Sequence, residues 1–225
     1  MVRLPSPKMY PMDIFKRRDD QACRCVRPVA RPWPGLLEEG MAVPPSRKTY
    51  RHGNLRAAAL TAAWNLVASG GQTALSMRQV SDAVGVAHRA LYNHFRDRDE
   101  LLDAVAAEAF KRLATQLAKA KTPREFTVRY VRFALAHPTI YALSVSRPHG
   151  TMKHNPSLQA AAHLVITEAM RVYCGDMKSS VERRRAVMKI LMIHYGGISL
   201  YAAGVLDLSG ERALVAELAA MTAPG

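Results

Sequence analysis

The sequence predicts an all-α fold of about nine helices. Its apolar residues are mostly Ala, Leu, Val and Met, whereas aromatic residues make up only 7% of the chain, and this composition favours helices over strands. Apolar residues recur at helical spacing in one segment after another, and no segment alternates convincingly with a period of two. We therefore expect a small three-helix unit joined to a larger helical domain.

Residues 1–48 are predicted to be a disordered, Pro-rich basic extension. Eight prolines fall in this stretch and would interrupt any long helix. A basic arm that follows the phosphates or the minor groove of DNA is one interpretation of it. An unstructured tail is a second interpretation. In a third, translation begins at Met41 and the residues before it are an upstream misreading.

The first helix is predicted from Tyr50 to Ser69. Asn54 can cap it, apolar residues from Leu55 onwards follow helical spacing, and the glycine pair at 70–71 ends it. Its many alanines allow close approach of neighbouring helices. We therefore expect it to support the two short helices that follow.

Residues 76–95 are predicted to form these two short helices, joined by a tight turn. Ser76 can cap the first, with Gln79 at capping-box spacing. Gly85 supplies a turn that favours a left-handed residue. Two helices this short need a third for support, and together the three have the arrangement of a DNA-binding helix-turn-helix. We therefore assign residues 49–96 to a DNA-binding domain.

The distribution of charge agrees with this assignment. The chain has a net charge of +14, and residues 51–96 hold five arginines but only one acidic residue, Asp82. A basic surface attracts polyanions. The predicted DNA contacts are the helix-terminal and outward polar residues of this segment: Ser76, Arg78, Ala87, His88, Arg89, Tyr92, Asn93, His94 and Arg98.

Residue type suggests a role for several of them. Arg89 can bind a guanine through two hydrogen bonds, and Ala87 can touch a thymine methyl group. Tyr92 and His94 can donate to phosphate oxygens, as can the backbone N–H groups at the start of the first motif helix. Arg98 adds a positive charge near the start of the following helix.

A long helix over residues 97–119 is predicted to leave this unit as a rigid connector. Acidic residues at its start and basic residues in its later turns suit the helix dipole. It opens the larger domain, residues 97–225, which holds five further helices. These are predicted at residues 123–137, 139–145, 157–173, 181–205 and 211–221.

Three motifs within residues 50–102 resemble the DNA-binding domain of the TetR family of transcriptional regulators. They are Gly85-Val86-Ala87, Leu91-Tyr92-Asn93-His94-Phe95 and Asp97-Arg98-Asp99. Ala87 departs from the family, which usually has a hydroxyl-bearing residue there. A helix cap and a phosphate contact are therefore expected to be missing.

The resemblance implies a dimeric regulator, usually a repressor in this family, that leaves a palindromic operator in double-stranded DNA when a small effector binds. Residues 97–225 would form its ligand-binding and dimerisation domain, and the homodimer would form through residues 181–207 and 211–221. The stretch LMIHYGGISLYAAG more weakly resembles a subgroup with a Trp-(three residues)-His-Gly signature. Leu191 and Tyr195 would replace the Trp and the His.

An apolar ligand pocket is expected in the larger domain, because Met-rich surfaces repack around varied shapes. The candidate lining residues are Phe133, Tyr141, Met152, Met170, Met188, Met192 and Tyr195. The histidines are not spaced as metal ligands, and no arrangement of catalytic residues is evident, so neither a metal, a cofactor nor enzymatic activity is predicted. A non-specific nucleic-acid-binding protein and an enzyme that uses this pocket are the alternative functions.

Three cysteines form an odd and sparse set, which favours a reducing compartment. No run reaches the roughly 18 apolar residues of a membrane span. We therefore expect a cytoplasmic protein without a membrane partner.

Overall fold

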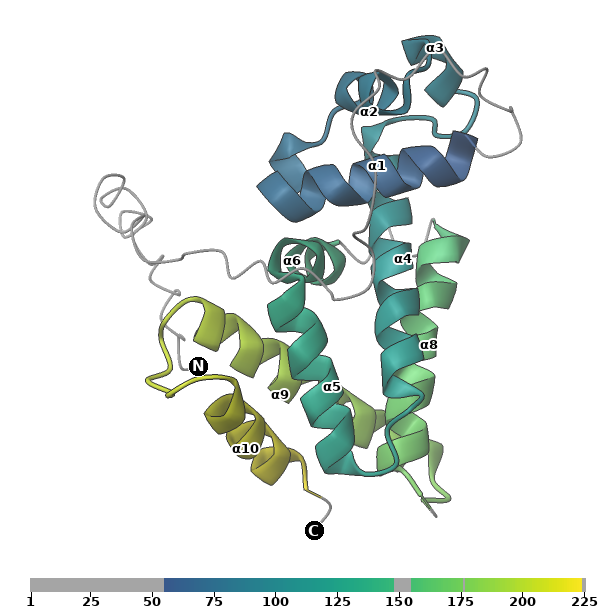
Figure 1. Ribbon diagram of the computed structural model, residues 1–225. Helices are drawn as coiled ribbons and strands as arrows, with labels where there is room; N and C mark the ends of the chain where they lie inside the picture. Colours follow the sequence, from purple (N-terminus) through teal and green to yellow (C-terminus); the bar gives the residue numbers. More distant parts are fainter. Residues whose placement is uncertain (1–54, 148–154, 176, 224–225) are drawn as a thin grey trace, which may run out of the picture. The chain divides into compact units, whose positions relative to one another are not determined.

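The computed structural model describes residues 55–147, 155–175 and 177–223, and their regular structure is entirely helical (Figure 1). Nine α-helices and one 3-10 helix occur in this part of the chain, which confirms the predicted fold class. The predicted extension at 1–48, the cap Asn54 and the pocket candidate Met152 lie outside the described residues. The elements are α1 Leu55–Gly70, η3 Gln72–Ala74, α2 Met77–Val84, α3 His88–Leu91, α4 Arg98–Leu117, α5 Pro123–Ala136, α6 Pro138–Ser146, α8 Pro156–Tyr173, α9 Ser180–Ala202 and α10 Glu211–Thr222.

The first three α-helices, with η3, form a small unit that we call the head (residues 55–95). α1 contacts η3, α2 and α3. Its alanines Ala59 and Ala63 are completely buried, as are Val80 of α2 and Leu91 of α3. The small side chains on α1 let the short helices approach closely, which supplies the third helix that they need.

The second helix of the motif is shorter than the sequence predicts. α3 covers only His88–Leu91, whereas the predicted apolar face extends to Phe95. The chain turns after Leu91, although the Phe95 N–H still donates to the Leu91 carbonyl at 2.9 Å. The Phe95 ring is buried, with the guanidinium carbon of Arg56 5.1 Å from its centroid. The turn after α3 therefore ends at a residue whose aromatic ring, that of Phe95, is buried in the core of the head.

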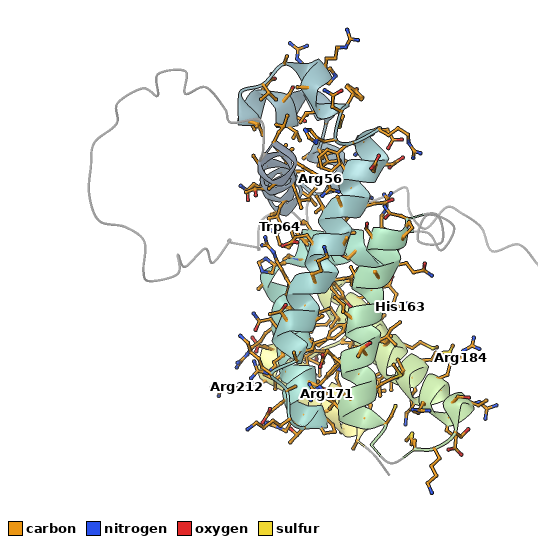
Figure 2. The ribbon with its side chains drawn as sticks, turned by 90° about the vertical axis from the view of Figure 1, so that its right-hand side faces the viewer. Arg56, Trp64, His163, Arg171, Arg184 and Arg212 are labelled. Carbon is orange, nitrogen blue, oxygen red and sulfur yellow. The ribbon has the colours of Figure 1, made fainter. Side chains whose placement is uncertain are left out.

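α4 joins the head to the C-terminal helices. Asp97 caps it, because its Oδ1 accepts from the Glu100 N–H at 2.8 Å. α4 contacts α1, and it also packs against α5, α6 and α8. At its C-terminal end, Arg171 of α8 donates to the Leu117 carbonyl at 3.1 Å and so satisfies a carbonyl of the last turn (Figure 2).

The remaining helices surround α5, which contacts α4, α6, α8, α9 and α10. α10 folds back onto α9 and α5. A Cβ atom at Gly197 of α9 would overlap the side chain of Leu218 in α10, so these two helices approach closely at the glycine. None of the described helices is both long and apolar enough to cross a membrane.

A buried ionic cluster ties α4 to the end of α6 and the start of α8. The Arg147 Nε atom lies 2.5 Å from Asp103 Oδ1, within the distance of an ion pair but without the alignment of a good hydrogen bond. Asn155 Nδ2 donates to the other carboxylate oxygen at 3.2 Å. Asn155 Oδ1 meanwhile accepts from the Leu158 N–H and caps α8. Asp103 thus joins α4 to two residues, Arg147 and Asn155, that are distant from it in the sequence.

We expect Asp103→Asn to lower the free energy of unfolding by about 3 kcal/mol, because it leaves the buried Arg147 charge without its closest partner. Urea denaturation at neutral pH measures this change. The matched control is Glu211→Gln, which breaks the exposed ion pair with Arg132 and should cost no more than about 1 kcal/mol. An equal loss of unfolding free energy in the two variants would show that burial does not strengthen the contact between Asp103 and Arg147.

His194 lies completely buried among the C-terminal helices. Its Nδ1 lies 2.8 Å from the Ile190 carbonyl, which can only accept, so the proton is assigned to Nδ1. Its Nε2 then accepts from the Thr127 hydroxyl at 3.1 Å. Burial lowers the pKa of His194 to about 4, so the imidazole is neutral in the folded protein near neutral pH.

This pKa makes stability depend on pH. The unfolded chain binds a proton at His194 below about pH 6.5 while the folded chain does not, so the contribution is complete above that pH and is lost as the pH falls towards 4. The free energy of unfolding should drop by roughly 2–3 kcal/mol between pH 7 and pH 4.5 from this group. Urea titrations of His194→Gln should lack that part of the drop. His163→Gln, which removes an exposed histidine, should keep it.

Candidate nucleic-acid interface

Ser76 caps α2 as the sequence predicts. Its Oγ accepts from the Gln79 N–H at 3.2 Å, and its hydroxyl donates to Gln79 Oε1 at 2.7 Å. The Gln79 side chain therefore reaches back to the hydroxyl of the cap rather than to its backbone N–H, which differs from the usual capping box. Both contacts fix the start of α2.

The turn between α2 and α3 depends on Gly85. Its φ is 75°, in the left-handed region that favours glycine. The N–H groups of Gly85 and Val86 both donate to the Ser81 carbonyl, at 2.9 and 3.1 Å. This closed turn sets the direction in which α3 leaves α2.

α3 and the turn after it present a polar surface to solvent. Ala87, His88, Arg89, Tyr92 and Asn93 are all exposed, and Tyr92 retains 47% of its accessible surface. The rings of His88 and Tyr92 meet edge to face with centroids 5.2 Å apart, and the Tyr92 hydroxyl lies 3.3 Å from His88 Nε2. Ala87 occupies the N-cap without a side-chain hydrogen bond, as its residue type requires.

Two exposed arginines of the head, Arg78 on α2 and Arg89 on α3, form no ion pair with any residue in the described part of the chain. His94, in the turn after α3, is half-buried. Exposed arginines without an acidic partner suit a polyanion such as DNA.

Arg98 differs from the expectation. Its Nε donates to the Leu75 carbonyl at 2.7 Å, and a terminal nitrogen donates to the Gln72 carbonyl. These contacts hold the loop between η3 and α2 against the start of α4. The structure thus gives Arg98 an additional role inside the head, while its side chain stays exposed and forms no ion pair among the described residues.

The structure separates the residues that the sequence assigns to one apolar pocket. Phe133 and Tyr141 are buried, whereas the other four described candidates are exposed. Met192 retains 66% of its accessible surface, which is incompatible with lining an enclosed pocket. The prediction is therefore corrected for α9, whose Met188, Met192 and Tyr195 lie on an outer face. Met170 likewise lies at the surface of α8.

Two contacts that organise the chain near the head were not foreseen from the sequence. One is the Asp103–Arg147 pair, and the other is the Arg112 guanidinium of α4, which lies 4.1 Å from the centroid of the Trp64 ring on α1. The partners in each pair are far apart in the sequence and follow no helical spacing. A single sequence holds no signal that joins them.

Comparison with known proteins agrees with this geometry. Residues 59–105 match the family model of bacterial regulatory proteins of the tetR family. No curated protein matches the chain. Among solved structures, a protein of unknown function from Rhodococcus sp. RHA1 is 28% identical, with a TM-score of 0.63 over 78% of this chain and 96% of that one.

Two further structures share the fold at lower identity. A putative TetR-family transcriptional regulator from Vibrio parahaemolyticus is 19% identical, with a TM-score of 0.57 over 75% of this chain and 96% of that one. A TetR protein from Acinetobacter baumannii AYE in complex with minocycline is 19% identical, with a TM-score of 0.53 over 73% and 92%. The subgroup resemblance at Leu191 and Tyr195 stays a prediction, because none of these matches concerns it.

The match covers α2, α3 and the Gly85 turn, together with most of α1 and the start of α4. These elements carry the capped helix-turn-helix and its exposed polar face. Residues 59–105 therefore form a helix-turn-helix of the tetR family of bacterial regulatory proteins, a family of DNA-binding transcriptional regulators.

Proposed function

We propose that this protein is a TetR-family transcriptional regulator, a homodimeric repressor that leaves a palindromic operator when a small apolar molecule binds to it. In this proposal residues 49–96 bind DNA, and residues 97–225 bind the ligand and form the dimer. The main observation in support of DNA binding is the exposed polar surface of α3. The Ser76 cap and the Gly85 turn hold this surface in place.

The chemistry of the exposed side chains in the head separates base contacts from phosphate contacts. Arg89 would bind a guanine, and the Ala87 methyl group would touch a thymine. His88 and Asn93 would complete the base contacts from the same surface. Phosphates would bind the N-terminal turn of α2 with Arg78 on one side of the groove, and Tyr92 with His94 on the other.

The proposed dimer rests on the outer face of α9. One face of this helix is buried within the subunit, through residues such as Val187, Ile190 and Ile198. The other face exposes large apolar side chains, and α10 adds Met221. The exposed residues on α9 and just after it are Val181, Met188, Met192, Tyr195, Leu200 and Val205. Exposed arginines interrupt this face in the first turns of α9, at 183–185. Large apolar side chains exposed together on a helix call for a partner, and a second copy of the chain would bring its own equivalent face.

A two-fold dimer explains why a palindrome is expected. Two heads would enter successive major grooves of the same DNA face, about 34 Å apart. A ligand that favours another spacing of the heads would lower operator affinity. α4 is the element through which it would act, since α4 contacts both the head and the C-terminal helices.

Two observations support a ligand in the C-terminal domain. Its core contains clustered aromatic rings, with Tyr130 and Tyr141 edge to face at 6.0 Å and the Tyr141 hydroxyl buried without a hydrogen-bond partner among the described residues. The Acinetobacter protein, which shares the fold, is in complex with minocycline. A titration of candidate small molecules against the protein–operator complex tests this part of the proposal.

Arg89→Ala is expected to weaken operator binding by about 1–3 kcal/mol, because it removes a two-bond base contact. The measurement is fluorescence anisotropy with short duplexes that cover the DNA upstream of the protein's own coding region. Arg124→Ala removes an exposed arginine from α5 and serves as the control for charge alone. An Arg89→Ala variant that still prefers the operator as strongly as the wild type would refute the role. Affinity should also fall steeply with salt.

Met192→Glu is expected to split the dimer, because it places a charge in the middle of the apolar face of α9. Sedimentation equilibrium should shift from twice the chain mass to the single-chain mass of 24.8 kDa. Leu164→Glu changes an exposed apolar residue on α8 and should leave the assembly intact. A Met192→Glu variant that remains dimeric would place the interface elsewhere.

A further inference from the structure

A surface cleft lies between α4 and the C-terminal end of α5, close to α1. α4 contributes Glu108, Lys111, Arg112 and Thr115, and the α5 side contributes Phe133 and His137. The cleft encloses about 290 Å³. Its lining includes neither Tyr130 nor Tyr141, the core rings near which the proposed function places the effector, although Phe133 belongs to the same core.

The charges of the cleft leave one positive charge in excess. Arg112 Nε donates to Glu108 Oε1 at 2.8 Å, which neutralises that carboxylate. The two terminal nitrogens of Arg112 make no hydrogen bond within the described chain, and Lys111 forms no ion pair there. Burial and the nearby Arg112 lower the pKa of His137, so this imidazole adds no charge at neutral pH.

The floor of the cleft is aromatic. The Phe133 and His137 rings meet with centroids 5.2 Å apart. His137 in turn contacts the edge of Trp64, at 5.7 Å, and Arg112 covers the face of the same indole. Trp64 belongs to α1 and lies beside α4 (Figure 2). An aromatic wall made of edge-to-face rings therefore adjoins a guanidinium whose terminal nitrogens make no hydrogen bond among the described residues.

We propose that this cleft is a binding site for a small aromatic monocarboxylate, of the size of benzoate. The terminal nitrogens of Arg112 would hold the carboxylate through two parallel hydrogen bonds, the geometry that a guanidinium fork favours. Lys111 supplies the second cation, and the ring packs on Phe133. The single excess charge suits a monoanion, and the small volume suits a ligand below drug size.

A purely structural role for Arg112 makes a different prediction. Its side chain would then only cover Trp64, as long cationic side chains commonly cover apolar surface. In that case no carboxylate would bind, and Lys111 would have no effect on any ligand. The two interpretations can be separated by a probe that reports on Trp64 itself.

The chain offers such a probe, because it has two tryptophans, Trp33 and Trp64. In a full-length Trp33→Phe protein, the emission comes from Trp64 alone. Titration with benzoate should change this emission saturably, whereas benzamide, which has the same shape and no charge, should not. No DNA is needed, so the result is independent of whether the protein proves to be a repressor.

Substitutions in the cleft test whether benzoate binds there. Lys111→Gln should weaken benzoate binding at least about fivefold and Arg112→Gln at least about tenfold, because each removes a charge-assisted contact. Lys119→Gln, which removes a lysine just beyond α4 and outside the cleft, should leave the dissociation constant unchanged. Lys111 makes no contact that the fold requires, so its variant remains informative if Arg112→Gln proves unstable.

Three outcomes would overturn the proposal. They are an emission that does not respond to benzoate, an equal response to benzamide, and a benzoate affinity that Lys111→Gln and Arg112→Gln leave unchanged. The last outcome would place the carboxylate in another part of the protein.

Discussion

A single helix, α4, has to satisfy the packing of two separate groups of helices. Its first turns complete the head, where Leu101 is fully buried and Arg98 holds the loop before α2 through the Leu75 carbonyl. Its later turns pack against α8, which satisfies the last carbonyls of α4 through Arg171. Any displacement of α4 therefore disturbs both groups of helices, which are also joined by the contact of α1 with α6.

Polar contacts at two positions along α4 restrict its position further. Asp103 lies where α4 passes the end of α6 and the start of α8, and its carboxylate is shared by Arg147 and Asn155. Further along α4, Arg112 covers Trp64 of α1. Salt bridges at an exposed surface contribute little, but Asp103 is buried, so its charge must stay paired. The chain thus adds a buried charge pair and a covered indole to the apolar packing of α4, in which Leu101 and Leu113 are buried.

Local signals in the sequence predicted most of the fold and the caps and turn of the helix-turn-helix. Ser76, Gly85 and Asp97 act within three or four residues of themselves, and the structure places each of them as caps or turns. Contacts between distant residues were not predictable, because helical spacing says nothing about the partner across a core. The outer face of α9 was misassigned for a related reason. Periodicity shows that Met188 and Met192 are apolar, but not whether they face their own core or another chain.

The shortness of α3 has a thermodynamic consequence for any complex that the head forms. A helix of one turn, His88–Leu91, has few internal hydrogen bonds, and Ala87 provides no cap from its side chain. Its orientation therefore depends on packing, because Leu91 and Phe95 on either side of the turn are buried in the head. A substitution that loosens either side chain would weaken any complex made through α3 without removing a contacting residue, because the contacting surface would lose its preorganisation.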